Sequence, residues 1–565
     1  MAIFVHTFIL YTMKKSALII LAGAFLASCA GGQKQGMSAE EYLGYNPDDQ
    51  QLLLGDDIAI AQTQYGKVKG YILHGVYTYL GIPYGAPTSG ENRFMPPQPP
   101  QPWEGILPTV FWGDSAPQIT DDKYHNDYGS FADHWNYYEV SEDCLRLNVW
   151  TPNTDQEKRP VLVWLHGGGY TNGNGIEQDG YNGENLAREG KIVFVSINHR
   201  LGPIGYTDFS AVDPKFQDSG NVGMLDIHAA LQWIHDNISN FGGDPANVTI
   251  MGQSGGGAKV CNMIAMSDNK GLVAKGVALS GNTYYAANQD FTSELGKYIA
   301  QKGGGMEKLQ AMTWREYIDL ANACAKEFAA AHPDTPVRGS FAPVADGVHF
   351  PKGNFYADKD AWSKDVPMMF CTTTAEWGMS RTSAELEAMT KEEAIKALQN
   401  PSLFSGPRTP EKAAEVYAAY EKVAAVLPNQ SKPIDIVNLA NASRDKVVAS
   451  ADCKKVQAAP VYMALFDYQP NLFNGRMHAF HCSDICYWFK NTDRMVTHTG
   501  GGKEPRELSN KMSAALLNFM RTGNPNNELL PEWPEYTPET GALMLLNNNC
   551  QVLNDPDREA RKALQ

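Results

Sequence analysis

The feature of this sequence that most constrains its fold is an alternation of short apolar runs with helical patterns. The runs are continuous and are bounded by Gly or Asp. Continuous apolar runs of this kind are typical of strands that are buried on both faces of a mostly parallel sheet. The expected strands are 160–166, 192–198, 247–252, 276–281, 366–373 and 461–468. The alternation predicts an α/β fold in which helices flank a large, mostly parallel central sheet.

Helical patterns lie between these runs, and one of them, MLDIHAALQWIHDNISNFGG, is expected to end at Gly242. The segment from about 284 to 450 is richer in Ala, Glu and Lys, and we interpret it as helical insertions rather than a separate domain. The sequence thus predicts a signal peptide over 1–28, an N-terminal extension over 29–55 and a single domain over 56–565.

The balance of charges is acidic, with 63 Asp and Glu residues against 47 Lys and Arg residues and a net charge of −16. Such a surface repels phosphate backbones, so we expect no nucleic-acid partner. Hydrophobic residues make up 43% of the chain, and this content predicts a folded core rather than disorder.

The N-terminus carries the pattern of a secretory signal. Lys14 and Lys15 precede an apolar run, 17–27, that is too short to span a bilayer comfortably. The sequence LASC at 26–29 resembles a bacterial lipobox, which implies cleavage before Cys29 and lipid attachment to it. We expect export to the bacterial periplasm or cell envelope, with the lipid on Cys29 as the only membrane anchor. A plain cleaved signal, which would release the protein, and an uncleaved anchor helix are the alternatives.

The glycine-rich turn GQSGGGAK, residues 252–259, fits two chemistries. A phosphate-binding loop needs Lys and then Ser or Thr directly after its last glycine. Here Ala258 follows Gly257, Lys259 comes one place late, and no hydroxyl ligand for magnesium follows it. The other chemistry is the nucleophile elbow G-x-S-x-G, in which a serine takes a strained backbone angle between a strand and a helix. Ser254 has this context, and we expect it to be a nucleophile.

A second glycine-rich motif, LHGGGY at 165–170, overlaps the end of the expected strand 160–166. Successive glycines let backbone N–H groups approach a substrate oxygen, as acyl transfer requires, although the motif by itself also fits a sharp strand-to-loop turn. Because both motifs occur in the order that acyl transfer uses, we expect the N–H groups of Gly168, Gly169 and Gly255 to form an oxyanion hole.

From about Gln62 to the C-terminus the chain resembles the type-B carboxylesterase family, the cholinesterase-like branch of the α/β-hydrolases. The resemblance rests on YLGIPYGAP, RFMPPQPP, SEDCLRLNVWTP, VSINHRLGPIGY, RTGNPNNELLPEWPEYT and the long segment that ends in GQSGGG. It implies the α/β-hydrolase fold and a serine hydrolase that cleaves carboxylic esters through a Ser-His-Glu triad and an acyl-enzyme intermediate. It also implies a small-molecule ester as substrate, no metal or organic cofactor, and no obligate protein partner.

The resemblance assigns the other two catalytic residues. Glu376 in CTTTAEW matches the family's acid, and Asp346 in APVADGV is its rival. His481 in HCSDICYWF matches the family's histidine, whereas the residues alone would favour His478 equally. The triad predicted in this way, Ser254, Glu376 and His481, has the chain order expected for this fold.

The cysteines invite a further interpretation, since His478, Cys482 and Cys486 are close enough in sequence to suggest a zinc site. The catalytic histidine occupies the same loop and a metal would compete for it, so a disulfide or free thiols are the preferred interpretation. Cys144 has no upstream partner of the kind that the family uses, and we expect it to be unpaired.

The chain departs from the family pattern next to the nucleophile. Gln253 stands where the family usually has Glu, which should lower any preference for cationic substrates, and Gly255 stands where Ala is usual. Arg93 and Glu142 match the family's buried ion pair, and we expect a structural role for them.

We assign Gln253, Trp135 and Tyr170 to the substrate pocket, with Trp135 in an aromatic-rich loop over 123–140. Surface packing of those aromatic residues is the alternative. A non-catalytic binding or adhesion protein on the same fold is the alternative function, which labelling of Ser254 by a fluorophosphonate would distinguish.

Overall fold

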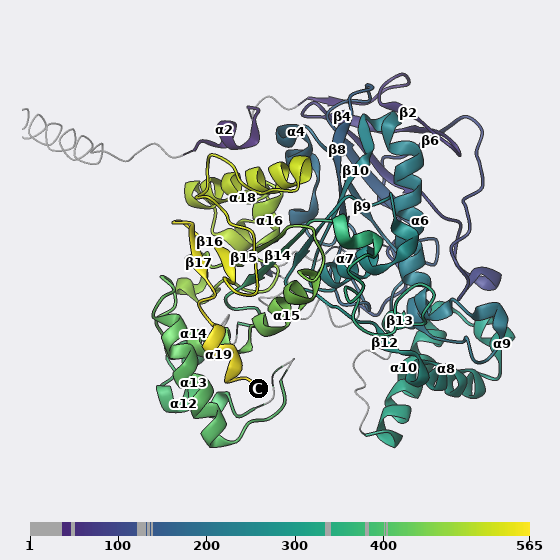
Figure 1. Ribbon diagram of the computed structural model, residues 1–565. Helices are drawn as coiled ribbons and strands as arrows, with labels where there is room; N and C mark the ends of the chain where they lie inside the picture. Colours follow the sequence, from purple (N-terminus) through teal and green to yellow (C-terminus); the bar gives the residue numbers. More distant parts are fainter. Residues whose placement is uncertain are drawn as a thin grey trace, which may run out of the picture. The chain divides into compact units, whose positions relative to one another are not determined.

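A large sheet forms the centre of the computed structural model, which describes residues 37–46, 51–120, 131–132, 136, 139–333, 341–378, 383–400, 402 and 405–565 (Figure 1). Within these residues the sheet has twelve strands in the order β1-β4-β5-β7-β9-β8-β10-β11-β14-β15-β16-β17. Neighbouring strands from β9 to β16 are parallel, and those at both ends of the sheet are antiparallel. The predicted architecture, a large and mostly parallel sheet, is confirmed.

All six expected strands are present, and the structure adds further strands that pair at the two ends of the sheet. In sheet order the strands are β1 (Leu52–Leu53), β4 (Tyr71–Leu73), β5 (Val76–Pro83), β7 (Arg146–Thr151), β9 (Val193–Ile197), β8 (Arg159–Leu165), β10 (Gly243–Gln253), β11 (Lys275–Leu279), β14 (Met368–Thr373), β15 (Val461–Phe466), β16 (Ala542–Leu546) and β17 (Gln551–Asn554). Two small sheets consist of β2 (Ile60–Thr63), β3 (Gly66–Lys69) and β6 (Ile106–Pro108), and of β12 (Ala287–Asn288) and β13 (Val344–Ala345).

The central strands are buried on both faces, because successive side chains of a strand point to opposite sides of the sheet. In β8, Val161 and Val163 belong to one hydrophobic cluster, whereas Leu162 and Trp164 belong to the other. Helices α6 (Val222–Asn237) and α7 (Gly255–Ala265) supply the first cluster, and α4 (Glu184–Gly190), α16 (Ile485–Trp488) and α18 (Lys503–Thr522) supply the second (Figure 1). These two helical layers account for the unbroken apolar runs in the sequence.

The helix expected to end at Gly242 ends in two steps. The α-helix α6 stops at Asn237, a 3-10 turn continues over Ile238–Phe241, and Gly242 has a left-handed φ of 74°. The glycine thus closes the turn, as expected, because a left-handed backbone strains other residues.

The segment from 284 to 450 is mainly helical, as the sequence predicts. Its helices pack in two groups, one around α8–α10 with a cluster of its own and one around α12–α14. The helices are α8 (Gln289–Gly303), α9 (Met306–Ala311), α10 (Trp314–Ala331), α11 (Ala384–Glu387), α12 (Lys391–Ala397), α13 (Pro410–Ala424), α14 (Pro433–Asn441) and α15 (Arg444–Lys454). The remaining described α-helices are α2 (Ala39–Leu43), α5 (Gly202–Tyr206), α17 (Val496–Thr499) and α19 (Arg558–Lys562).

Residues Ala39–Gln565 form one compact unit. Part of the expected N-terminal extension packs into this unit, since Tyr42 of α2 is buried and its hydroxyl is 2.9 Å from the hydroxyls of Ser509 and Thr492. The expected signal peptide and Cys29 lie outside the described residues. No described helix has both the length and the apolar character that a membrane crossing requires.

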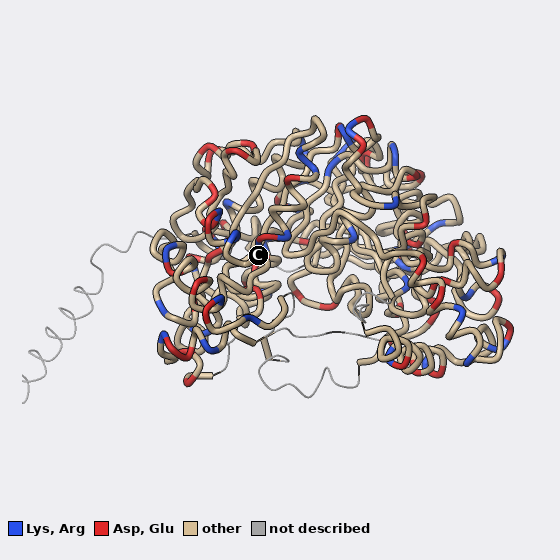
Figure 2. The backbone as a smooth tube through the Cα atoms, turned by 60° about the horizontal axis from the view of Figure 1, so that its bottom comes forward, with Lys and Arg blue, Asp and Glu red and all other residues tan. Residues whose placement is uncertain are grey.

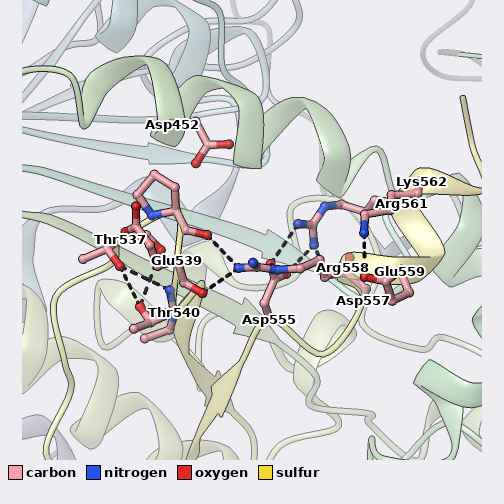
Figure 3. Close-up of polar contacts among 12 residues, drawn as sticks. Asp452, Thr537, Glu539, Thr540, Asp555, Asp557, Arg558, Glu559, Arg561 and Lys562 are labelled. Carbon is pink, nitrogen blue, oxygen red and sulfur yellow. Dashed lines mark hydrogen bonds and ion pairs between the residues drawn. The ribbon is translucent and has the colours of Figure 1, made fainter.

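The C-terminal helix α19 is tied to the body by ionic contacts (Figure 3). Arg558 donates to Asp555 Oδ2 at 2.6 Å, and Arg561 is paired with both Asp555 and Asp557. Asp557 also accepts from Arg444, the first residue of α15, at 3.0 Å. The last of these contacts joins the C-terminal segment to the beginning of α15. Elsewhere acidic and basic residues are interspersed along the chain (Figure 2).

Candidate active site

Ser254 lies in a tight turn at the carboxyl edge of the central sheet. Strand β10 ends at Gln253, helix α7 begins at Gly255, and Ser254 between them has φ 58° and ψ −125°. This is a strained conformation for a residue with a side chain. The turn also needs its glycines, because a Cβ on Gly256 would collide with the carbonyl oxygen of Leu165. The local structure is therefore that of a nucleophile elbow.

A cavity of about 1000 Å³ opens at this turn. Every described residue of the predicted active site and pocket lines it: Gly168, Gly169, Tyr170, Gln253, Ser254, Gly255, Glu376 and His481. Trp135 lies outside the described residues. The cavity wall combines aromatic side chains with polar ones, namely Tyr181, Tyr285, Phe291, Phe341 and Trp377 with Asn172, Asn262, Asn282, Thr283 and Asn288.

His481 and Glu376 are held together by backbone and side-chain contacts. The backbone N–H of His481 donates to the carbonyl oxygen of Glu376 at 3.0 Å, and its Nδ1 is 2.5 Å from Glu376 Oε2. The other carboxylate oxygen, Oε1, accepts from the backbone N–H of Thr373 at 2.8 Å. Both oxygens of a buried carboxylate are thus satisfied, which is the arrangement that orients an imidazole and stabilises its charged form.

The imidazole is also contacted on its faces. The indole of Trp377 stacks on His481 with a centroid distance of 4.4 Å, and Gln253 Nε2 lies 3.3 Å from each ring nitrogen. Cys482 Sγ donates to Gln253 Oε1 at 3.1 Å. Among the described residues, the polar contacts of the His481 ring nitrogens are with Glu376 and Gln253, and no hydrogen bond joins the ring to Ser254. Catalytic hydrogen bonds are often long in an empty active site and tighten with substrate.

The two rival residues lie elsewhere. His478 Nε2 is 3.0 Å from Glu387 and its Nδ1 is 3.4 Å from Asp435, so its ring sits between two carboxylates. Asp346 accepts backbone N–H groups of the turn that follows it and the Asn221 amide at 2.9 Å. Neither rival lines the cavity.

Gly168, Gly169 and Gly255 line the same cavity. Their backbone N–H groups donate no hydrogen bond to any residue that the structure describes. Gly255 approaches the first loop so closely that a Cβ on it would collide with the carbonyl oxygen of Gly169. Three unpaired donors beside Ser254 are what a developing oxyanion needs.

Electrostatics around the imidazole involve a second buried carboxyl group. Burial, and then the neighbouring Glu376 carboxylate, raise the pKa of Asp484 to about 7. Its Oδ2 accepts from Trp488 Nε1 at 3.2 Å. Burial also raises the pKa of the Cys371 thiol and keeps it neutral.

The remaining sequence assignments concern structure. Arg93 and Glu142 form a buried, two-armed ion pair with N···O distances of 2.7 and 2.5 Å, and Arg93 also donates to the carbonyl oxygens of Leu309 and Met312. Cys144 is a free, buried thiol, as expected, and the other described cysteines are free as well.

Within the described residues, no three His, Cys, Asp or Glu side chains are arranged to hold a metal ion. Tyr170 receives a hydrogen bond from Asn262 Nδ2 at 2.9 Å.

Sequence reasoning missed Trp377, the role of Cys482 beside Gln253, and the position of Lys259 behind the glycine-rich loop. Trp377 directly follows the predicted acid, but its stacking on His481, a residue distant in the sequence, leaves no local sequence pattern. Lys259 was visible only as the misplaced lysine of a phosphate-loop pattern.

Comparisons with known proteins agree with this geometry. Residues 57–564 match the model of the carboxylesterase family. The chain belongs to the carboxylesterase family. The carboxylesterase is 31% identical to the para-nitrobenzyl esterase of Bacillus subtilis over 515 residues. The alignment covers 89% of this chain and 98% of the relative. It is 31% identical over 500 residues to the medium-chain fatty acyl-CoA hydrolase precursor of Anas platyrhynchos, with coverage of 84% and 86%.

Solved structures show the same relationship. An esterase from Clostridium hathewayi superposes on this carboxylesterase with a TM-score of 0.77 at 30% identity, covering 91% of this chain and 99% of that one. A Geobacillus stearothermophilus carboxylesterase gives a TM-score of 0.71 at 28% identity, with coverage of 90% and 100%. The carboxylesterase therefore has the α/β-hydrolase fold and is a carboxylic ester hydrolase.

Proposed function

We propose that this carboxylesterase cleaves its substrates through Ser254, His481 and Glu376. The observation that carries the proposal is their convergence. A strained serine, a carboxylate-bound imidazole and three unpaired N–H groups line one cavity, although they come from four separate segments of the chain.

In this mechanism Ser254 Oγ attacks the ester carbonyl, and His481 takes the hydroxyl proton. Glu376 keeps the imidazole oriented and stabilises its protonated form. The N–H groups of Gly168, Gly169 and Gly255 hold the oxyanion of the tetrahedral intermediate; the loss of one such donor costs about 3 kcal/mol. His481 then gives the proton to the leaving alcohol. A water molecule, activated by the same imidazole, releases the acyl group from Ser254.

The preferred substrates are uncharged esters. Gln253 is neutral and buried against the imidazole, so the position beside the nucleophile has no charge to attract a cation. The aromatic part of the cavity wall offers apolar surface to an acyl or alcohol group. The names of the relatives agree with such a range: one is a para-nitrobenzyl esterase, and the Clostridium hathewayi enzyme can hydrolyse aliphatic aromatic polyesters.

Labelling with a fluorophosphonate tests the residue assignment. The reagent should modify Ser254 and abolish hydrolysis of p-nitrophenyl acetate, and Ser254→Ala should remove both labelling and activity. Ser280, a second serine that lines the cavity, supplies the control, because Ser280→Ala should keep both. A folded wild-type protein that hydrolyses no ester and takes no label would instead support a binding function.

We further propose that residues 1–28 are a signal peptide, that Cys29 carries lipid, and that 29–55 form an extension of a hydrolase domain over 56–565. The protein would then be held at a cell envelope by its lipid alone. Metabolic labelling with an alkyne fatty acid in a bacterial host should mark the wild type and not Cys29→Ser. Labelling of neither protein would favour a plain cleaved signal and release.

A further inference from the structure

Lys259 is a fully buried lysine directly behind the glycine-rich loop. It lies on α7, five residues after Ser254, and it does not line the cavity. Its Nζ donates to the carbonyl oxygen of His166 at 3.0 Å and, more weakly, to that of Gly167 at 3.5 Å. Lys259 therefore binds the glycine-rich loop on the side opposite to the cavity.

The two carbonyl groups belong to peptide units that run into the loop. In a trans peptide the C=O and the N–H point in opposite directions. A donor that holds the Gly167 carbonyl behind the loop therefore turns the N–H of Gly168 toward the cavity. The same carbonyl oxygen is 3.0 Å from His166 Nδ1. Donation to a carbonyl also polarises its peptide unit and strengthens the N–H at the other end.

Few groups around Lys259 compensate for the cost of burying its charge. Burial lowers the pKa of Lys259 to about 7, and the Glu177 carboxylate opposes this shift. The rings of His166 and His199 stack on each other nearby. The pKa of each histidine is well below its usual value, mainly because of burial and secondly because of the charge of Lys259. A buried ammonium group with only two carbonyl acceptors within the described residues is costly, and an apolar side chain of similar size is often better for stability.

Resting on the proposed function, we propose that Lys259 is a positioning residue. It fixes the start of the glycine-rich loop through the His166 carbonyl and orients the peptide unit that carries the Gly168 N–H through the Gly167 carbonyl. On this proposal, the protein tolerates the free-energy cost of burying Lys259 because the side chain serves catalysis rather than folding.

Lys259→Met tests this inference, because methionine has a similar length and no donor. We expect kcat for p-nitrophenyl acetate to fall about 10- to 100-fold with little change in KM, since the donors are displaced rather than removed. The affinity for a trifluoromethyl ketone, whose hemiketal with Ser254 needs the oxyanion hole, should fall in parallel. The melting temperature should stay the same or rise.

Lys454→Met is the matched control. Lys454 is also buried, burial lowers its pKa to about 7 as well, and its Nζ donates to the Ser363 carbonyl at 2.6 Å and to Gln457 at 2.7 Å. Neither partner lines the cavity. This variant should keep kcat and inhibitor affinity. Lys259→Gln, which retains a side-chain donor, should have an intermediate kcat and serves as the second variant should Lys259→Met not fold.

Unchanged kcat and inhibitor affinity in Lys259→Met, or equal losses in both methionine variants, would overturn the inference while leaving the serine mechanism intact. The serine mechanism has its own readout, since it fails when a fluorophosphonate does not label Ser254 in the wild type.

Discussion

Gln253 Nε2 lies 3.3 Å from both ring nitrogens of His481. A nitrogen equidistant from both lies over the face of the ring, because an in-plane approach would collide with Cε1. The residue before the proposed nucleophile therefore contacts the proposed base, and a charge at position 253 acts on that base as well as on the substrate.

Gln253→Glu should move the acid limb of the pH–kcat/KM profile to higher pH by about one unit, because a negative charge over the ring favours imidazolium. Activity at pH 6 should fall more than activity at pH 8. Gln253→Met, which adds no charge, is the control and should leave the limb in place. An unmoved limb in the glutamate variant would show that the charge is screened from His481.

His481→Gln should lower kcat by about 10⁴-fold or more, since the general base is lost. His478→Gln should reduce stability only, because His478 sits between Glu387 and Asp435 away from the cavity. Steady-state kinetics on p-nitrophenyl acetate and thermal melts of both variants separate the two effects. The reverse pattern would exchange the roles of the two histidines.

Gly255→Ala should lower kcat about 10- to 100-fold, since the new Cβ displaces the Gly169 carbonyl and the N–H groups beside it. Alanine raises helix propensity, so a loss of activity without a loss of helix stability would point to the collision. Gly378→Ala is the control near the site, because the nearest atom to its Cβ, Ala375 O, is at an ordinary 3.5 Å. Full activity in Gly255→Ala would mean that the loop around Gly169 moves to accept the new Cβ without displacing the oxyanion-hole donors.

Arg93→Met should lower the free energy of unfolding by about 3–5 kcal/mol, because it leaves the Glu142 carboxylate buried without its partner. Urea unfolding measures the loss, and kcat of the folded fraction should be unchanged. The matched control is Arg315→Met, which breaks an exposed pair with Asp319 and should cost less than about 1 kcal/mol.

Asp484→Asn should change how stability depends on pH. Because the pKa of Asp484 is raised to about 7 in the folded protein, the unfolded chain releases this proton at lower pH, and stability falls as pH rises from about 4 to 7. The variant should exceed the wild type by roughly 2–4 kcal/mol at pH 8 and match it at pH 4. Urea unfolding at both pH values checks this, with Asp493→Asn, in a partly exposed ion pair with Arg506, as control. An equal difference at both pH values would contradict the assignment.

Much of the fold could be predicted from the sequence because its signals are local. A strand buried on both faces must be continuously apolar, so β8, β9, β10, β11, β14 and β15 were visible as runs. The end strands were harder to see: β1 and β17 are two and four residues long and are not buried. The turn at Ser254 was also local, since its glycines and its strained backbone belong to a few consecutive residues.

The site required more than local pattern. His481 and Glu376 are 105 residues apart, and the resemblance to a family, not the residues themselves, separated His481 from His478. The sequence by itself determined the sheet, the elbow and the glycine-rich loop, because periodicity and glycine placement act over a few residues. Only the tertiary structure decided that Gln253 lies over His481, that Gly255 touches Gly169 and that Lys259 holds the loop from behind. These contacts depend on how distant segments pack, and no short stretch of sequence encodes them.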